Sequence, residues 1–189
     1  RPDLLVLDLM MPRKSGFDVC DELRRKDESL PILILTAKEA ESDKVLAFGL
    51  GADDYMTKPF SMGELKLRIA AILRRARLGE TAGRVEDVFS FASWKVDAAK
   101  FSLVAPDGAM TPLTSLELGI LRLLAAHPNE VIGRERFLNE LWGVSYYGTT
   151  RTLDSRISTL RRKLGPDGAY IETQRGVGYR FNVPPARKS

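Results

Sequence analysis

Two short runs of aliphatic residues constrain the fold of this chain more than any other feature. They are Leu4-Leu5-Val6-Leu7 and Ile32-Leu33-Ile34-Leu35, and between them Phe17 to Lys26 places its apolar side chains on one helical side. A strand that is apolar at every position is typically buried on both faces of a parallel sheet. Strands that alternate with helices form βαβ units. The first part of the chain is therefore predicted to be an α/β domain with a parallel sheet.

The same alternation continues to about residue 77. We expect a helix over Ser42 to Gly49, a strand over Tyr55 to Thr57 and a helix over Ser61 to Arg75. Ser61 with Glu64 forms a capping box, which marks the start of the last helix. Residues 78–83 are polar, contain glycine and lack periodicity, so we interpret them as a linker.

Residues 84–186 have a different pattern, in which short strands come first, then three helices and a hairpin. Pro106-Asp107-Gly108 is a turn signature between strands, and Thr114 with Glu117 is a second capping box. This part is predicted to be an α+β domain. Its expected elements are strands over 88–91, 94–96, 101–104 and 110–112, helices over 114–126, 134–142 and 150–164, and a hairpin over 170–173 and 178–182.

The positive charge is gathered in the second domain. The chain has a net charge of +4, whereas residues 1–77 carry 14 basic and 13 acidic side chains. Residues 151–180 carry seven basic and three acidic side chains, as expected for a surface that meets polyanions. One cysteine, Cys20, fits a reducing cytoplasm, and one Cys with one His argues against a zinc cluster of the usual kind. No apolar run reaches the roughly 18 residues of a membrane span.

Three polar residues follow the three predicted strands of the first domain. They are Asp8, Thr36 and Lys58. Ligands of parallel sheets bind at the carboxyl ends of strands, so a carboxylate, a hydroxyl and an ammonium there could surround one phosphoryl group. Asp8 would be the nucleophile, Thr36 a hydrogen-bond partner and Lys58 the charge partner.

These residues stand in motifs that resemble a known family. Leu7-Asp8-Leu9-Met10-Met11-Pro12 with Gly16, Leu35-Thr36-Ala37, and Gly51 to Phe60 with its Lys58-Pro59 resemble receiver domains of two-component response regulators. The second half resembles the winged helix-turn-helix output domain of the OmpR/PhoB type. The resemblance covers nearly the whole chain. It implies a flavodoxin-like α/β receiver followed by an α+β DNA-binding domain, in a transcription regulator and not an enzyme.

The resemblance also implies roles for individual residues. Asp8 would accept a phosphoryl group from a sensor histidine kinase, with Mg²⁺ held partly by Asp8 and the Met10 carbonyl, and Thr36 and Tyr55 would be the switch pair. Phosphorylation would favour a symmetric homodimer through one receiver face. The ion pairs expected there are Lys44 with Glu64, Asp54 with Arg68, and Asp53 with Arg75.

One departure from the receiver pattern stands out. Receivers begin with a strand that ends in two adjacent acidic residues, and nothing before Asp8 can supply them. A strand, a helix, a second strand and their loops would need about 40 to 45 residues more. Either the receiver is N-terminally incomplete only in this sequence, or the protein is a truncated receiver whose DNA binding does not depend on phosphorylation. Without the missing first strand, the strand over Leu4 to Leu7 has an uncovered backbone edge.

The helix over 150–164 separates two faces. Leu153, Ile157, Leu160 and Leu164 recur at helical spacing and should face the core. In the resembled family this is the recognition helix, and the final hairpin is the wing that reaches the minor groove. Arg156 departs from the family, where histidine is usual. The residues expected to contact promoter DNA are Arg151, Thr152, Ser155, Arg156, Thr159, Arg161, Arg162 and Lys163 from the helix, and Thr173, Arg175 and Tyr179 from the wing.

Other functions fit less well. A phosphatase of the haloacid-dehalogenase type needs a second aspartate two residues after the nucleophile, where this chain has Met10. The dinucleotide-like Gly49-Leu50-Gly51 segment lacks the final glycine of that fingerprint. A regulator that acts only through protein contact remains an alternative. The loop from Gly143 to Gly148, with Tyr146 and Tyr147, is either an ordinary turn or the segment that meets RNA polymerase.

Overall fold

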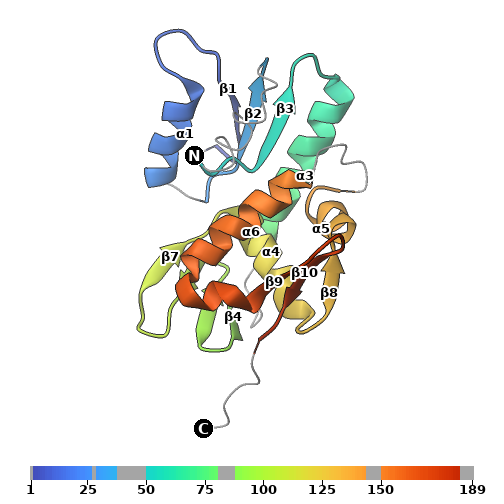
Figure 1. Cartoon of the computed structure of the whole chain (residues 1–189). Helices are drawn as coiled ribbons and strands as arrows, with labels where there is room; N and C mark the ends of the chain where they lie inside the picture. The colour runs from blue at the N-terminus through green and yellow to red at the C-terminus, as the bar shows by residue number, and fades with distance from the viewer. Residues whose placement is uncertain (1, 27–28, 38–49, 81–87, 144–149, 184–189) are drawn as a thin grey trace.

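The computed structural model describes residues 2–26, 29–37, 50–80, 88–143 and 150–183 (Figure 1). Within these ranges the chain forms two domains, one above the other in Figure 1. No helix of the described ranges has the length and hydropathy needed to cross a membrane.

The first domain contains a three-stranded parallel sheet, as predicted. Its strands are β1 (Leu5–Asp8), β2 (Ile32–Thr36) and β3 (Asp54–Thr57), in the order β1-β2-β3. Helix α1 (Gly16–Lys26) joins β1 to β2, and α3 (Met62–Glu80) follows β3. The aliphatic run of β2 is almost entirely buried because β2 is the central strand, whereas Val6 on the edge strand β1 is 41% exposed. The expected helix over 42–49 lies outside the described residues.

Helix α3 is longer than predicted. It continues to Glu80, so the first three residues of the predicted linker are helical. An isolated glycine inside a helix costs only about 1 kcal/mol, and Gly79 is flanked by residues that favour helix. The polar, glycine-bearing composition of this stretch was therefore a poor marker of the helix end. The rest of the predicted linker lies outside the described residues.

The second domain opens with an antiparallel sheet of four strands. These are β4 (Val88–Phe91), β5 (Trp94–Asp97), β6 (Ser102–Val104) and β7 (Met110–Pro112). Helix α4 (Ser115–Ala126) follows at the predicted place, and its capping box is formed, with Thr114 and Glu117 each accepting from the other's backbone N–H. Helices α5 (Arg134–Leu141) and α6 (Arg151–Lys163) complete the helical part.

A second sheet carries the predicted hairpin. The hairpin consists of β9 (Ile171–Gln174) and β10 (Gly178–Phe181), and β10 also pairs with the unpredicted strand β8 (Val131–Gly133). The 3₁₀ helix η2 (Gly165–Tyr170) was missed as well. Both elements are too short for a periodic pattern to identify. The core of this domain contains Leu153, Ile157 and Leu160 of α6 and Leu164 directly after it, as predicted, each at most 1% exposed.

Candidate functional site: a receiver carboxylate and a nucleic-acid interface

Asp8 and Lys58 meet at the carboxyl ends of the receiver strands. The parallel registers β1–β2 and β2–β3 bring the last residues of all three strands to one edge of the sheet. There the Lys58 ammonium lies 2.5 Å from Asp8 Oδ2. The Met10 backbone N–H donates to Asp8 Oδ1 over 2.9 Å. The hydrogen bond from Lys58, followed by that from Met10, holds the pKa of the Asp8 carboxyl below its usual value.

The loop that carries Asp8 is held by a glycine. A Cβ atom on Gly16 would lie 2.3 Å from the Asp8 carbonyl oxygen, so no other residue fits there without moving the backbone. The Gly16 N–H also donates to the Leu9 carbonyl over 3.2 Å. The start of α1 therefore packs directly on the end of β1. This contact fixes the position of the carboxylate, whose side chain is still 33% exposed.

The remaining predicted phosphoryl-site residues line the same strands. Thr36, which is fully buried, ends β2, and its carbonyl accepts from the Lys58 backbone N–H over 2.8 Å. Tyr55 is 8% exposed and packs in the core cluster of the first domain. The strand registers thus bring Asp8, Thr36 and Lys58 to one edge. Tyr55 lies two residues before the end of β3 and packs in the core.

The described residues offer only part of a magnesium site. Asp8 supplies one carboxylate, and Met10 lies two residues further along the loop. No group of three or more His, Cys, Asp or Glu side chains with metal-binding geometry occurs among the described residues. The described donors therefore do not fit a complete Mg²⁺ shell by themselves.

The predicted dimer residues have partners within this single chain. Arg68 donates to Asp54 over 2.8 Å and to Glu64 over 2.7 Å. Asp53 accepts from Arg24 and from the Ile32 N–H, each over 2.9 Å, and from Ser115 of the second domain over 3.0 Å. A single chain does not test pairing between two copies, and Lys44 lies outside the described residues.

Asp53 and Arg75, which were expected to pair across the dimer, each have other partners within the chain. Arg75 instead donates to the Leu141 carbonyl, and its guanidinium lies 5.4 Å from the centre of the Trp142 ring. Asp53 is already occupied by Arg24 and Ser115. Asp53 and Arg75 therefore both contact residues of the output domain, Ser115 and Leu141 respectively.

Three residues predicted to contact DNA are buried in this arrangement. Arg156 and Thr152 on α6 are 1% and 2% exposed, and Arg156 donates to the Ala52 carbonyl of the first domain. Tyr179 is 3% exposed, because its ring packs in the core and its hydroxyl donates to Asp154 over 2.5 Å. Helical periodicity shows which face of α6 packs on the core of its own domain. It does not show which residues of the opposite face are covered by the first domain.

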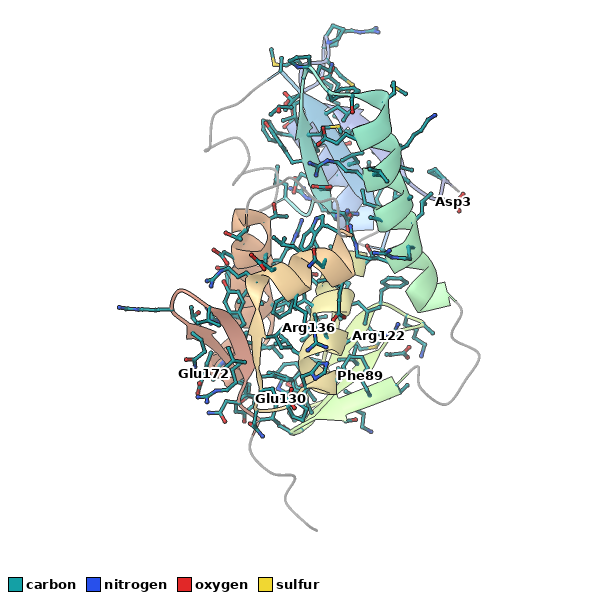
Figure 2. The ribbon with its side chains drawn as sticks, turned by 90° about the vertical axis from the view of Figure 1, so that its right-hand side faces the viewer. Asp3, Phe89, Arg122, Glu130, Arg136 and Glu172 are labelled. Carbon is teal, nitrogen blue, oxygen red and sulfur yellow. The ribbon has the colours of Figure 1, made fainter. Side chains whose placement is uncertain are left out.

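The other predicted contacts fall into two groups. Arg162, Thr173 and Arg175 are exposed, and Ser155 and Thr159 are partly exposed. Arg161 and Lys163 have structural partners: Arg161 donates to the Ile171 carbonyl and to Thr173, and Lys163 pairs with Glu117 over 3.0 Å. The Arg151 side chain lies outside the described part. In Figure 2, Glu172 marks the hairpin, which lies apart from the receiver sheet.

Arg24 and Ser115 were missed by sequence reasoning. Arg24 is 8% exposed and its guanidinium reaches the carbonyls of Leu30 and Gly51 as well as Asp53. A signal existed for Arg24, since it lies four residues after the buried Cys20 and thus on the inward face of α1. Nothing in the sequence marks Ser115 as an interdomain residue.

Comparison with known proteins agrees with this architecture. Residues 1–70 match the family model described as response regulator receiver domain, and residues 108–181 match the one described as transcriptional regulatory protein, C terminal. Response regulator MprA from Mycobacterium leprae (strain TN) is 41% identical over 187 residues, which cover 98% of this chain and 81% of that relative. Among solved structures, two RitR mutants superpose with TM-scores of 0.73 and 0.74 at 26% identity, covering 96% of this chain and 79% and 80% of those chains.

The sequence prediction of family and fold class is therefore confirmed. A receiver with a parallel sheet precedes a winged helix domain, in a chain built for phosphorelay-controlled regulation of transcription. Such proteins work with DNA and with histidine kinases. The chain belongs to the two-component response regulators of the OmpR/PhoB type.

Proposed function

We propose that Asp8 is the phosphoryl acceptor of this response regulator and that Lys58 is its charge partner. The observation that carries this proposal is the 2.5 Å contact between Lys58 Nζ and Asp8 Oδ2 at the ends of adjacent strands. An Asp8 oxygen would attack the phosphorus of a phosphohistidine. The P–N bond breaks, and the imidazole leaves with the electron pair and takes up a proton.

The surroundings of Asp8 suit this reaction. An aspartate carboxyl is ionised at neutral pH even at its ordinary pKa, and the hydrogen bonds from Lys58 and Met10 lower the pKa of Asp8 further, so the carboxylate form is the one present. Lys58 can follow the negative charge from the carboxylate to the new phosphoryl oxygens. Thr36, at the end of the central strand, is the proposed hydrogen-bond partner of that group, and Tyr55 the second switch residue. Asp8 and the Met10 carbonyl are the two proposed Mg²⁺ ligands among the described residues, and the remaining ligands of a complete shell would have to come from elsewhere.

The output domain is proposed to bind promoter DNA through α6 and the wing. Arg175 at the wing tip and Arg162 near the end of α6 are exposed cations that can reach DNA. Arg161 is a positioning residue, since it ties β9 to α6 through Ile171 and Thr173. We also propose a receiver homodimer on phosphorylation, contact of the loop after α5 with RNA polymerase, a cytoplasmic location, and a regulatory role without catalytic turnover.

The phosphoryl proposal is tested with a small phosphodonor. The full chain is incubated with acetyl phosphate and Mg²⁺, and its intact mass and oligomeric state are measured by mass spectrometry and light scattering. We expect the wild-type chain to gain one phosphoryl group and to shift towards dimer. Asp8→Asn should do neither, because the amide is not a nucleophile at this pH. Asp18→Asn, on the exposed side of α1, is the matched control. Phosphorylation of the Asp8→Asn variant would refute the proposal.

The DNA proposal is tested at the wing. Arg175→Ala should weaken binding to a selected DNA duplex by about 1–3 kcal/mol, because an exposed cation at the groove is lost. Arg180→Ala, whose side chain pairs with Glu172 on the neighbouring strand, should have a smaller effect. Affinities are measured by fluorescence anisotropy at several salt concentrations. Binding that is independent of salt would contradict a phosphate-contacting interface.

A further inference from the structure

Asp154 on α6 is held by side chains from two other parts of the output domain. Its Oδ1 atom accepts from Arg134 Nε, at the start of α5, over 3.1 Å. The same oxygen accepts from the hydroxyl of Tyr179, on strand β10, over 2.5 Å. The side chain of Asp154 is 41% exposed and that of Arg134 is 20% exposed. One carboxylate therefore joins α5, α6 and the wing, which all lie in the lower domain of Figure 1.

Arg134 also holds the turn of the wing. Its backbone N–H donates over 3.1 Å to the carbonyl of Val177, the last residue of the turn that begins with Arg175. Its guanidinium lies 4.9 Å from the centre of the Tyr179 ring, where a cation is attracted by the aromatic face. The partner of Asp154 is thus fixed to the turn that carries the exposed cation Arg175.

The second strand of the wing is tied to α6 as well. Arg161, two helical turns after Asp154, donates to Thr173 over 2.8 Å and to the Ile171 carbonyl over 2.9 Å. Its guanidinium lies 5.8 Å from the centre of the Tyr179 ring. Side chains of α6 therefore contact both β9 and β10, and the carboxylate of Asp154 is the acceptor on the β10 side.

The location of Asp154 is unusual for a residue that only stabilises the fold. It precedes Ser155, a predicted DNA contact, and a carboxylate at such a place repels phosphate groups. Its pair with Arg134 is partly exposed, and pairs of this kind contribute little to the free energy of folding. What the pair can supply is geometry, because residues that touch DNA must be held in place by the side chains behind them.

We propose that Asp154 is a positioning residue for DNA recognition. It fixes the wing relative to α6, so that Arg175 reaches one groove while the contacts of α6 reach the other. This role rests on the DNA-binding function proposed above.

The test is a double-mutant cycle between Asp154 and the wing. A duplex is selected from a pool of random sequence with the wild-type chain. Arg175→Ala is made in the wild-type chain and in the Asp154→Ala chain, and the affinities of the full-length chains are measured by fluorescence anisotropy. Arg162→Ala, which removes an exposed cation of α6 itself, is made in both backgrounds for comparison. Asp107→Ala, which removes an exposed carboxylate from the turn between β6 and β7, is the matched control background.

The cost of losing Arg175 should depend on Asp154. Arg175→Ala should lower the affinity about tenfold in the wild-type and Asp107→Ala chains, but less than about threefold in the Asp154→Ala chain, because a displaced wing no longer brings Arg175 to its groove. Arg162→Ala should lower the affinity by the same factor in every background, because α6 keeps its place in the core. An equal cost of Arg175→Ala in all backgrounds would overturn the positioning role.

A second variant separates positioning from direct base reading. A carboxylate in the major groove can accept from the amino group of cytosine. Tyr179→Phe removes the hydroxyl that Asp154 holds and leaves the carboxylate in place. Tyr170→Phe, which removes a hydroxyl bonded to Asp167, is the matched control. Positioning predicts that Tyr179→Phe reduces the cost of Arg175→Ala, whereas an undiminished cost would overturn it. If Asp154→Ala does not fold, the Tyr179→Phe chain takes its place.

The order of the wing is also measurable without DNA. Hydrogen–deuterium exchange of the backbone is followed by mass spectrometry in the wild-type, Asp154→Ala and Asp107→Ala chains. Exchange in residues 171–181 should become about three- to tenfold faster in the Asp154→Ala chain only, while exchange in α4 stays unchanged. Equal protection of the wing in all three chains would overturn the positioning role. Absence of DNA binding in every chain, with faster exchange of the wing, would instead overturn the proposed function.

Discussion

The two ends of the receiver strands hold the same kinds of charged groups in opposite environments. At the carboxyl ends, Asp8 and Lys58 form a pair whose side chains are 33% and 42% exposed. At the amino ends, Asp53 pairs with Arg24, and these side chains are 1% and 8% exposed. The exposed pair is accessible to the phosphoryl group that we propose it binds, whereas the buried pair holds the backbone and the two domains together.

The difference shows that burial decides what an ion pair does. A buried pair is costly to break because the remaining charge has lost its water, while an exposed pair contributes little because water replaces the partner. The three predictions that follow measure this contrast.

The largest effect is expected at Arg24. Arg24→Ala should lower the free energy of unfolding by about 3–5 kcal/mol, because Asp53 and the carbonyls of Leu30 and Gly51 lose a buried donor. Arg25→Ala is the matched control, since its side chain is 76% exposed and pairs with Asp21 on the same helix. The control should change stability by less than about 1 kcal/mol. Urea unfolding followed by circular dichroism gives both values. Equal effects of the two variants would contradict the contrast.

An intermediate effect is expected at Gly51. Its φ of +98° is unfavourable for any residue with a Cβ, and a Cβ there would lie 2.7 Å from Arg24 Nε. Gly51→Ala should therefore destabilise the receiver by about 1–3 kcal/mol. Gly63→Ala, where the nearest atom is 3.8 Å away in a helix, is the control and should be neutral or stabilising. Thermal melting compares the two. A Gly51→Ala variant as stable as the wild type would show that the Arg24 cluster adapts.

The smallest effect on stability is expected at Lys58. Lys58→Ala should change the free energy of unfolding at neutral pH by less than about 1 kcal/mol, since the pair is exposed. The pKa of Asp8 should rise towards its usual value, because its largest lowering cause is removed. A carboxyl with a lowered pKa stabilises the fold above the unfolded value of about 3.9, and this contribution disappears as pH falls through the folded pKa. The variant should lose less stability over that acid range. NMR titration of the Asp8 side chain would test it, and an unchanged pKa would contradict the assignment to Lys58.

Most of the helices and strands could be predicted from the sequence. Of the two groups of charged residues at the ends of the receiver strands, only the one at the carboxyl ends could be predicted. Asp8, Thr36 and Lys58 could be found because each directly follows an aliphatic run, and parallel strands align their ends. The capping box of Thr114 and Glu117 could be found because it is local in sequence. The cluster around Asp53 could not, because Arg24, Asp53 and Ser115 are distant in sequence. The spacing from Cys20 places Arg24 on the inward face of α1, but it does not identify the partners of Arg24.

Helix α6 separates what the two levels of structure determine. The sequence by itself determined that Leu153 and Leu160 face the core, because apolar residues at helical spacing are buried wherever the helix packs. It also determined the receiver strands, the family, and which face of α6 points away from the core of the output domain. Only the tertiary structure decided that Arg156 on that side is covered while Arg175 on the wing stays exposed. The physical reason is that periodicity records one packing surface, and the second surface of α6 is made by a receiver loop about a hundred residues away in the chain.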